Sequence, residues 1–82
     1  MTRVLIADDH KIFREGLSEL LSTRYGITIV GTASDGAETL AKLNTLNPDL
    51  LILDISMKIL DGFDVLHHVR RQGTPVKILM LL

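Results

Sequence analysis

Two short apolar segments that each end in aspartate decide the fold: Val4-Leu5-Ile6-Ala7 before Asp8 and Asp9, and Leu50-Leu51-Ile52-Leu53 before Asp54. Neither segment alternates apolar with polar residues, which is the pattern of strands buried on both faces of a parallel sheet. In open sheets of this kind, ligands bind beyond the carboxyl ends of the strands, where the strand order reverses. If these two strands flank that point, the three aspartates converge there.

Strands and helices are expected to alternate along the whole chain without a linker. The expected elements are strand 4–7, helix 11–24, strand 27–34, a helix capped at 35 and broken at 47–48, strand 49–53, a helix capped at 61 that ends near 72–73, and strand 76–82. The last strand also has the pattern of burial on both faces. Such alternation with right-handed crossovers predicts an open α/β sheet, and 82 residues make one domain at most.

Each helix is expected to bury one apolar face, chosen by helical spacing. The expected inward residues are Ile12, Phe13, Leu17, Leu20 and Leu21 in the first helix, Ala37, Leu40, Ala41 and Leu43 in the second, and Phe63, Leu66 and Val69 in the third. Asp35 and Glu38 resemble a capping box, in which each side chain bonds the other residue's backbone N–H. Lys11 and Glu15 have the spacing of an ion pair on the exposed face.

The composition excludes several classes of protein. There is no cysteine, so neither a disulfide framework nor a thiolate metal site is possible. The net charge is −1 with dispersed charges, which leaves no basic surface for nucleic acid. No apolar run approaches the roughly 18–20 residues of a membrane span, and the N-terminus leaves no room for a signal peptide. We therefore expect a cytoplasmic protein with no membrane contact.

The three aspartates have ordinary structural interpretations when each is taken alone. Asp8 or Asp9 could cap the first helix, and Asp54 could bond to the turn after its strand. Taken together, like charges within a few ångströms destabilise a fold, and a hard divalent cation removes that conflict. Mg²⁺ takes oxygen ligands and often rests on carboxylates plus a phosphate. A carboxylate can also attack phosphorus and become an aspartyl phosphate.

Several stretches together resemble the receiver domain of two-component response regulators, in the NarL-like subgroup that usually precedes a helix-turn-helix DNA-binding domain. They are VLIADDH at 4–10, LLILDISM at 50–57 and LDG at 60–62, with FREGL at 13–17 as a further match. The resemblance spans the whole chain. It implies a flavodoxin-like receiver fold with strand order 2-1-3-4 and, in the full-length protein, DNA binding through a separate output domain.

The resemblance also implies roles for individual residues. Asp54 would accept phosphate from a phosphohistidine of a sensor histidine kinase. Asp9 would ligate Mg²⁺ directly, Asp8 would hold it largely through water, and the backbone carbonyl of Ser56 would complete the protein ligands. The chain would then be a signalling module that helps its own phosphorylation and hydrolysis, and not an enzyme acting on outside substrates.

The sequence departs from the family pattern in three places. Lys58-Ile59 stand where the family usually has Pro-Gly, and Leu82 stands where it has Thr or Ser. The fifth strand, its phosphate-contacting lysine, the aromatic switch residue, the last helices and the output domain are missing, so residues 1–82 are expected to be a C-terminally truncated receiver. The bare last strand and the inner face of the first helix then predict a homo-oligomer, in the simplest case a dimer.

Some alternatives stay open from sequence. Lys58 is either an ordinary solvated lysine or a cation that lowers the Mg²⁺ affinity of the cluster, and His10 is either a helix-start residue, the favoured interpretation, or a tuner of the site. A phosphohydrolase would usually carry an acid where Ser56 stands, and a dinucleotide site would need a Gly-rich loop after the first strand. The serious rival is a phosphorylation-incompetent fragment that acts only as an oligomerisation or interaction module.

Overall fold

Strands and helices alternate strictly in the computed structural model, which describes residues 2–81. The elements are β1 (Arg3–Ala7), α1 (Lys11–Tyr25), β2 (Thr28–Ala33), α2 (Gly36–Leu46), β3 (Leu50–Asp54), α3 (Gly62–Arg71) and β4 (Lys77–Leu81). The strands form one parallel sheet in the order β2-β1-β3-β4, which confirms the predicted fold class and strand order. Leu82, which we expected at the end of the last strand, lies outside the described residues.

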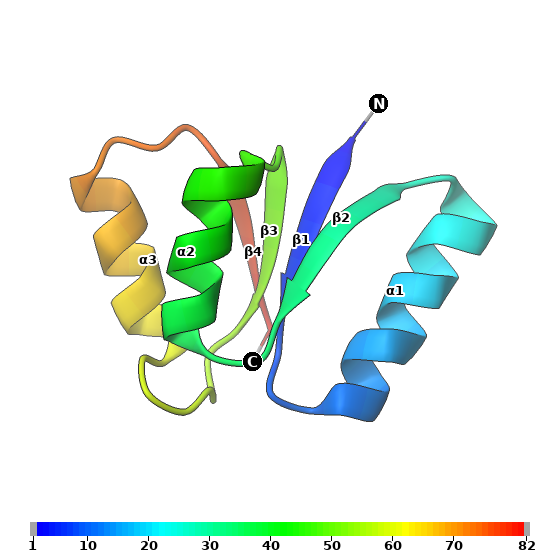
Figure 1. Ribbon diagram of the computed structural model, residues 1–82, viewed down its shortest axis with the longest axis horizontal. Coiled ribbons are helices and arrows are strands. Elements are labelled where there is room, and N and C mark those ends of the chain that lie inside the picture. Colours follow the sequence, from blue (N-terminus) through cyan, green and yellow to red (C-terminus); the bar gives the residue numbers. More distant parts are fainter. Residues whose placement is uncertain (1, 82) are drawn as a thin grey trace.

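The sheet is covered on its two faces by different helices, with α1 on one side and α2 and α3 on the other (Figure 1). β1 and β3 occupy the middle of the sheet, and their side chains from Val4 to Ala7 and from Leu51 to Leu53 are buried. Val4, Ile6 and Ile52 form the apolar cluster that includes Leu17 and Leu21 of α1. The alternate residues of both strands pack toward α2 and α3. Burial on both faces is therefore confirmed for the two central strands.

β4 does not fit the prediction of a strand buried on both faces. Lys77 and Leu79 are exposed, Leu79 by 52%, and the other three residues are half-buried. Within residues 2–81 β4 pairs only with β3, so its outer edge carries unpaired backbone groups. α1 contacts mainly β1 and β2. Within the described residues β4 is the last strand of the sheet, and its exposure follows this position and not hydropathy alone.

The predicted inner face of α1 is wrong at three of its five residues. Ile12, Phe13 and Leu20 are exposed by 87%, 48% and 46%, and only Leu17 and Leu21 pack against the sheet. The helix contacts mainly β1 and β2, and Leu17 and Leu21, which are spaced i, i+4, make its apolar contact with the sheet. The broader apolar face that the sequence indicates has no counterpart among the described residues.

In α2 the buried row is displaced from the predicted one. Thr39 and Leu43 are buried and Leu40 is half-buried, whereas Ala37 and Ala41 are exposed. Thr39 is tolerated inside because its hydroxyl donates a hydrogen bond of 2.7 Å to the Asp35 carbonyl oxygen. A buried hydroxyl that is satisfied within its own helix leaves no apolar signal in the sequence.

In α3 Val65 and Val69 are buried and Leu66 is half-buried, whereas Phe63 is 59% exposed and was wrongly predicted to face inward. The row begins at Gly62, which is also buried. The inward rows of both α2 and α3 thus start from a glycine at the first helical residue. Such a residue lets the helix approach neighbouring backbone closely.

The helix ends largely follow the predicted capping chemistry. Asp35 accepts a hydrogen bond from the Glu38 N–H at 2.8 Å, but the Glu38 carboxylate reaches the Ser34 N–H instead of the Asp35 N–H. Asp61 caps α3 in a complete capping box with Asp64. The predicted Lys11–Glu15 ion pair is present with an N–O distance of 4.0 Å.

We predict that Glu38 makes the stability of the fold depend on pH. The Ser34 N–H hydrogen bond, with a further contribution from Lys42, lowers the pKa of Glu38 from 4.5 to about 2. Because the folded pKa is depressed, the contribution is present above pH 4.5 and is lost as the pH falls toward the folded value. The side chain is 39% exposed, so solvent screening limits the contribution to roughly 1 kcal/mol or less.

Urea denaturation of wild type and Glu38→Gln between pH 6 and pH 3 tests this. The glutamine keeps an acceptor for the Ser34 N–H but does not titrate. Wild type should lose stability relative to the variant as the pH falls below 4.5. Parallel stability curves for the two proteins would contradict the assignment.

Candidate functional site

Acidic side chains meet at the carboxyl ends of β1 and β3. The two strands are paired with Ala7 opposite Leu53, so Asp8 directly follows one strand and Asp54 ends its neighbour. Both aspartates are buried, at 4% and 9% exposure. One ligand atom from each of Asp8, Asp9, His10 and Asp54 lies within 4.8 Å of all the others. The convergence expected from the strand order is therefore present in the structure.

Asp8 and Asp54, which follow or end the two central strands, are each held by a turn of the same kind. Asp8 accepts a hydrogen bond through Oδ1 from the backbone N–H of His10 at 2.8 Å. Asp54 accepts one through Oδ1 from the backbone N–H of Ser56 at 3.1 Å. Aspartate favours this bond to the backbone two residues on. It fixes one oxygen of each carboxylate and leaves each Oδ2 without a hydrogen bond from residues 2–81.

Asp9 holds an oxygen that the protein does not satisfy. Its Oδ1 atom is buried and has no hydrogen-bond partner among the described residues. His10 Nδ1 lies 3.0 Å from this atom, but the pair does not have the geometry of a hydrogen bond. A buried acceptor left without a hydrogen bond costs about 1–3 kcal/mol, and the charge of a protonated His10 ring offsets only part of that cost at this ion-pair distance. The oxygen-rich cluster thus has the donor chemistry and the unmet demand of a hard-cation site.

His10 lies at the start of α1, as expected, but its ring faces the acidic pair. It occupies the N-cap position and makes no side-chain capping bond there. Its Nδ1 is also 3.0 Å from Asp8 Oδ1, while 72% of the side chain is exposed. The hydrogen bond to Asp8, and then the charges of Asp9 and Asp8, raise the pKa of His10 above 6.5. The ring position favours the interpretation of His10 as a neighbour that tunes the cluster.

Neither Asp8 nor Asp9 caps the first helix, so the ordinary interpretation of these two residues is wrong. The N-cap is His10, and the Asp8 carboxylate accepts a hydrogen bond from the N–H of His10 and not from an N–H inside the helix. Arg14, in the first turns of α1, donates a hydrogen bond of 2.7 Å to the Asp8 carbonyl oxygen. It anchors the β1–α1 loop, and its only sequence signal is its place one turn into the helix.

The loop between β3 and α3, residues 55–61, carries the remaining predicted ligand. Ser56 is exposed, and its N–H holds Asp54. Ile55 accepts a hydrogen bond from the Gly62 N–H at 3.2 Å, which ties the two ends of the loop together. Lys58 is exposed on this loop, and no ion pair joins it to an acidic residue in the part of the chain described. That its ammonium lowers the Mg²⁺ affinity of the cluster stays a prediction.

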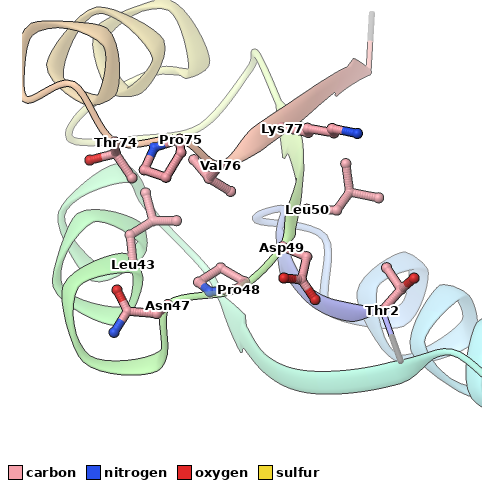
Figure 2. A pocket seen from close by; sticks show the side chains of 10 residues that line it. All are labelled: Thr2, Leu43, Asn47, Pro48, Asp49, Leu50, Thr74, Pro75, Val76 and Lys77. Carbon is pink, nitrogen blue, oxygen red and sulfur yellow. The ribbon is translucent and has the colours of Figure 1, made fainter.

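A cavity lies at the other end of the sheet (Figure 2). It has a volume of about 590 Å³ and is open to solvent. It is lined by Thr2, Leu43, Asn47, Pro48, Asp49, Leu50, Thr74, Pro75, Val76 and Lys77. These residues surround the amino ends of β3 and β4, whereas the acidic cluster lies at the carboxyl ends. The cluster is identified by its charges and its unsatisfied oxygen, and not by the volume of a cavity.

Comparisons with known proteins agree on one family. The family model described as response regulator receiver domain matches residues 4–81. The response regulator protein VraR of Staphylococcus aureus is 38% identical over 79 residues, which are 96% of this chain and 38% of VraR. The signal receiver domain of the putative response regulator NarL from Mycobacterium tuberculosis superposes with a TM-score of 0.91 at 38% identity, over 96% of this chain and 64% of that one.

A second similar structure contains DNA. RcsB from Salmonella enterica serovar Typhimurium, bound to promoter rprA in the presence of phosphomimetic BeF₃⁻, superposes with a TM-score of 0.86 at 29% identity. The match covers 98% of this chain and 42% of that one. The chain thus spans well under half the length of its curated relative VraR, at 38%. Among its described helices, none has the length and apolar character needed to cross a membrane.

We predict that Gly62 is required for the geometry of the acceptor strand end. A Cβ at this position would lie 2.7 Å from the Asp54 carbonyl oxygen and 2.6 Å from Ile55 Cα, both backbone atoms that cannot rotate away. Gly62→Ala should therefore lower the free energy of unfolding by about 1–3 kcal/mol, despite the better helix propensity of alanine.

Gly16→Ala is the matched control, because nothing lies within 4 Å of a Cβ at Gly16 in α1. This variant should gain about 0.5–1 kcal/mol. Urea denaturation of both variants measures the two changes. If Gly62→Ala gains stability while Gly16→Ala loses it, or if both variants change stability by the same amount, the loop does not press on Gly62.

Proposed function

The chain belongs to the response regulator receiver domain family, and from this premise we propose that Asp54 is its phosphoacceptor. A phosphohistidine of a sensor histidine kinase would be the donor. One carboxylate oxygen of Asp54 attacks phosphorus, the P–N bond breaks, and the electron pair stays on the departing imidazole, which takes up a proton. The observation that carries the proposal is the meeting of three carboxylates around a buried, unsatisfied oxygen of Asp9.

Asp54 fits the role of nucleophile better than its acidic neighbours do. Its Oδ1 is oriented by the Ser56 N–H, and its Oδ2 takes no hydrogen bond from residues 2–81. Asp8, by contrast, accepts the His10 N–H and lies against the His10 ring. Asp54 also ends a central strand whose preceding residues are buried, so the backbone behind it is rigid. A rigid, singly restrained carboxylate is suited to attack along one direction.

Mg²⁺ is the cofactor we propose for the cluster. Asp9 would ligate it directly, Asp8 largely through water, and Asp54 and the backbone carbonyl of Ser56 would complete the protein ligands. Bound there, the ion would neutralise the carboxylates and the developing charge on the phosphoryl oxygens. The unsatisfied Asp9 Oδ1 supports this assignment, because a cation would meet the demand that the protein leaves open.

The biological setting follows from the family. A response regulator of this type couples a kinase signal to an output, and RcsB is seen bound to a promoter. We propose that this receiver likewise belongs to a transcriptional regulator and reaches DNA only through a further domain, since its own net charge is −1. Its chemistry changes the chain itself, so we propose a cytoplasmic signalling module and not an enzyme acting on outside substrates.

Phosphorylation can be tested directly with a small donor. Incubation with acetyl phosphate and Mg²⁺ should add one phosphoryl group, seen by intact mass, and the gain should disappear in Asp54→Ala. Asp49→Asn is a matched control at the opposite end of the sheet, where the side chain accepts the Arg3 N–H. It should be phosphorylated as wild type is. No gain in wild type would favour the rival, a phosphorylation-incompetent interaction module.

The second proposal is self-association through the exposed edge. β4 has an unpaired side within residues 2–81, and its Leu79 is 52% exposed. An apolar edge strand invites pairing with another chain, and a charge on it opposes that pairing. We therefore propose a homo-oligomer, in the simplest case a dimer in which β4 strands meet.

Light scattering at micromolar concentration measures the outcome. Wild type should have a mass above that of one chain, and Leu79→Lys should shift toward the monomer because it places a charge on the edge. Phe63→Lys, which adds the same charge to an exposed position of α3 outside the predicted interface, should leave the mass unchanged. A wild-type protein that is entirely monomeric would remove the proposal.

A further inference from the structure

An unusual backbone conformation occurs at Ile59, in the loop that follows the acceptor. Its φ is +70°, and it shares a positive φ with only one other non-glycine residue in the described chain, Asn47. Asparagine tolerates this region, whereas a β-branched residue there is a genuine outlier. The Leu60 N–H also donates to the Lys58 carbonyl oxygen at 2.8 Å, a bond across two residues. This is the pattern of a γ-turn, and its positive-φ form is rare and strained.

The side chain of Ile59 does not offset this strain by packing. It is 76% exposed and belongs to neither apolar cluster. Burial of an isoleucine is what could compensate an unfavourable backbone, and here almost none occurs. The strain must therefore be imposed by the residues on either side.

Those flanking residues are anchored firmly. Met57 is buried in the core at 6% exposure, and Leu60 packs against the same core. The Leu60 carbonyl stands so close to Gly36 that any Cβ there would collide with it. Asp61 is held by its capping box with Asp64. Only two residues join Met57 to Leu60, so the chain must reverse sharply, and Ile59 takes the conformation that the anchors demand.

Relaxation of Ile59 would disturb the acceptor. A return to negative φ breaks the γ-turn bond and pulls on Met57 or Leu60. Met57 is adjacent to Ser56, whose N–H orients Asp54. Strain in the closed loop is released on opening, so it raises the population of the open form by the corresponding factor.

We propose that Ile59 is a positioning residue whose backbone strain sets how often the β3–α3 loop opens and releases Asp54 from Ser56. The inference concerns the loop of the unphosphorylated chain. It bears on the proposed function only because that loop carries Ser56.

Hydrogen exchange of the whole chain, without Mg²⁺ or phosphodonor, tests the proposal. In Ile59→Gly and Ile59→Asn, which accept positive φ, exchange at the Ser56 and Leu60 amides should slow by roughly three- to tenfold. Ile59→Val is the matched control: it stays β-branched and should exchange as wild type does. The Leu5 amide in the central strand reports global opening and allows local changes to be separated from it.

Gly73 calibrates the strain in the same molecule. It has the same φ of +70°, and nothing lies within 4 Å of a Cβ there. Gly73→Ile should lower the folding equilibrium constant by about tenfold or more. If the constant of this variant equals that of wild type, the premise that isoleucine is strained at this φ is wrong. The proposal is also overturned if Gly, Asn and Val at position 59 exchange alike, or if Gly and Asn exchange faster. None of these readouts depends on phosphorylation, so the proposed acceptor role stands or falls separately.

Discussion

Repulsion among Asp8, Asp9 and Asp54 is the constraint on which the rest of the structure depends. The pairing of β1 with β3 brings the first and last of these side chains together, and the tight turns after each strand orient them. The apolar burial of the two central strands supplies the stability that holds like charges in place. The crowding disfavours the empty site and favours any cation that fills it, which is why a fold can keep such a cluster for function.

Most of this site could be predicted from sequence, because its parts follow from local patterns. Unbroken apolar strands indicate central positions in a parallel sheet, and the carboxyl ends of such strands meet. The side-chain roles of β4 and α1 could not be predicted in the same way. Leu79 and Ile12 look like core residues, but burial depends on which elements lie opposite, and α1 contacts mainly β1 and β2. Hydropathy indicates which residues could be buried, but it does not show which of them are buried in the fold.

Backbone constraints were the other part that sequence could not supply. In the sequence Gly62 is only part of a motif, yet its missing side chain lets α3 begin against Asp54. Ile59 stands where the family usually has glycine, and its positive φ depends on the packing of Met57 and Leu60 against the core, which the sequence does not show. His10 lay beside the acidic pair in the sequence, but its ring position is set by the start of α1. Such features depend on tertiary packing and become visible only with it.

Thermal unfolding in Mg²⁺ tests the central claim most directly. A cation that binds the folded cluster and not the unfolded chain must raise the unfolding temperature. At constant ionic strength, replacing Na⁺ with Mg²⁺ should raise the unfolding temperature of wild type and leave that of Asp9→Asn nearly unchanged. An unfolding temperature of wild type that is the same in both salts, or an equal rise in Asp9→Asn, would contradict the account of a carboxylate cluster built to hold a divalent cation.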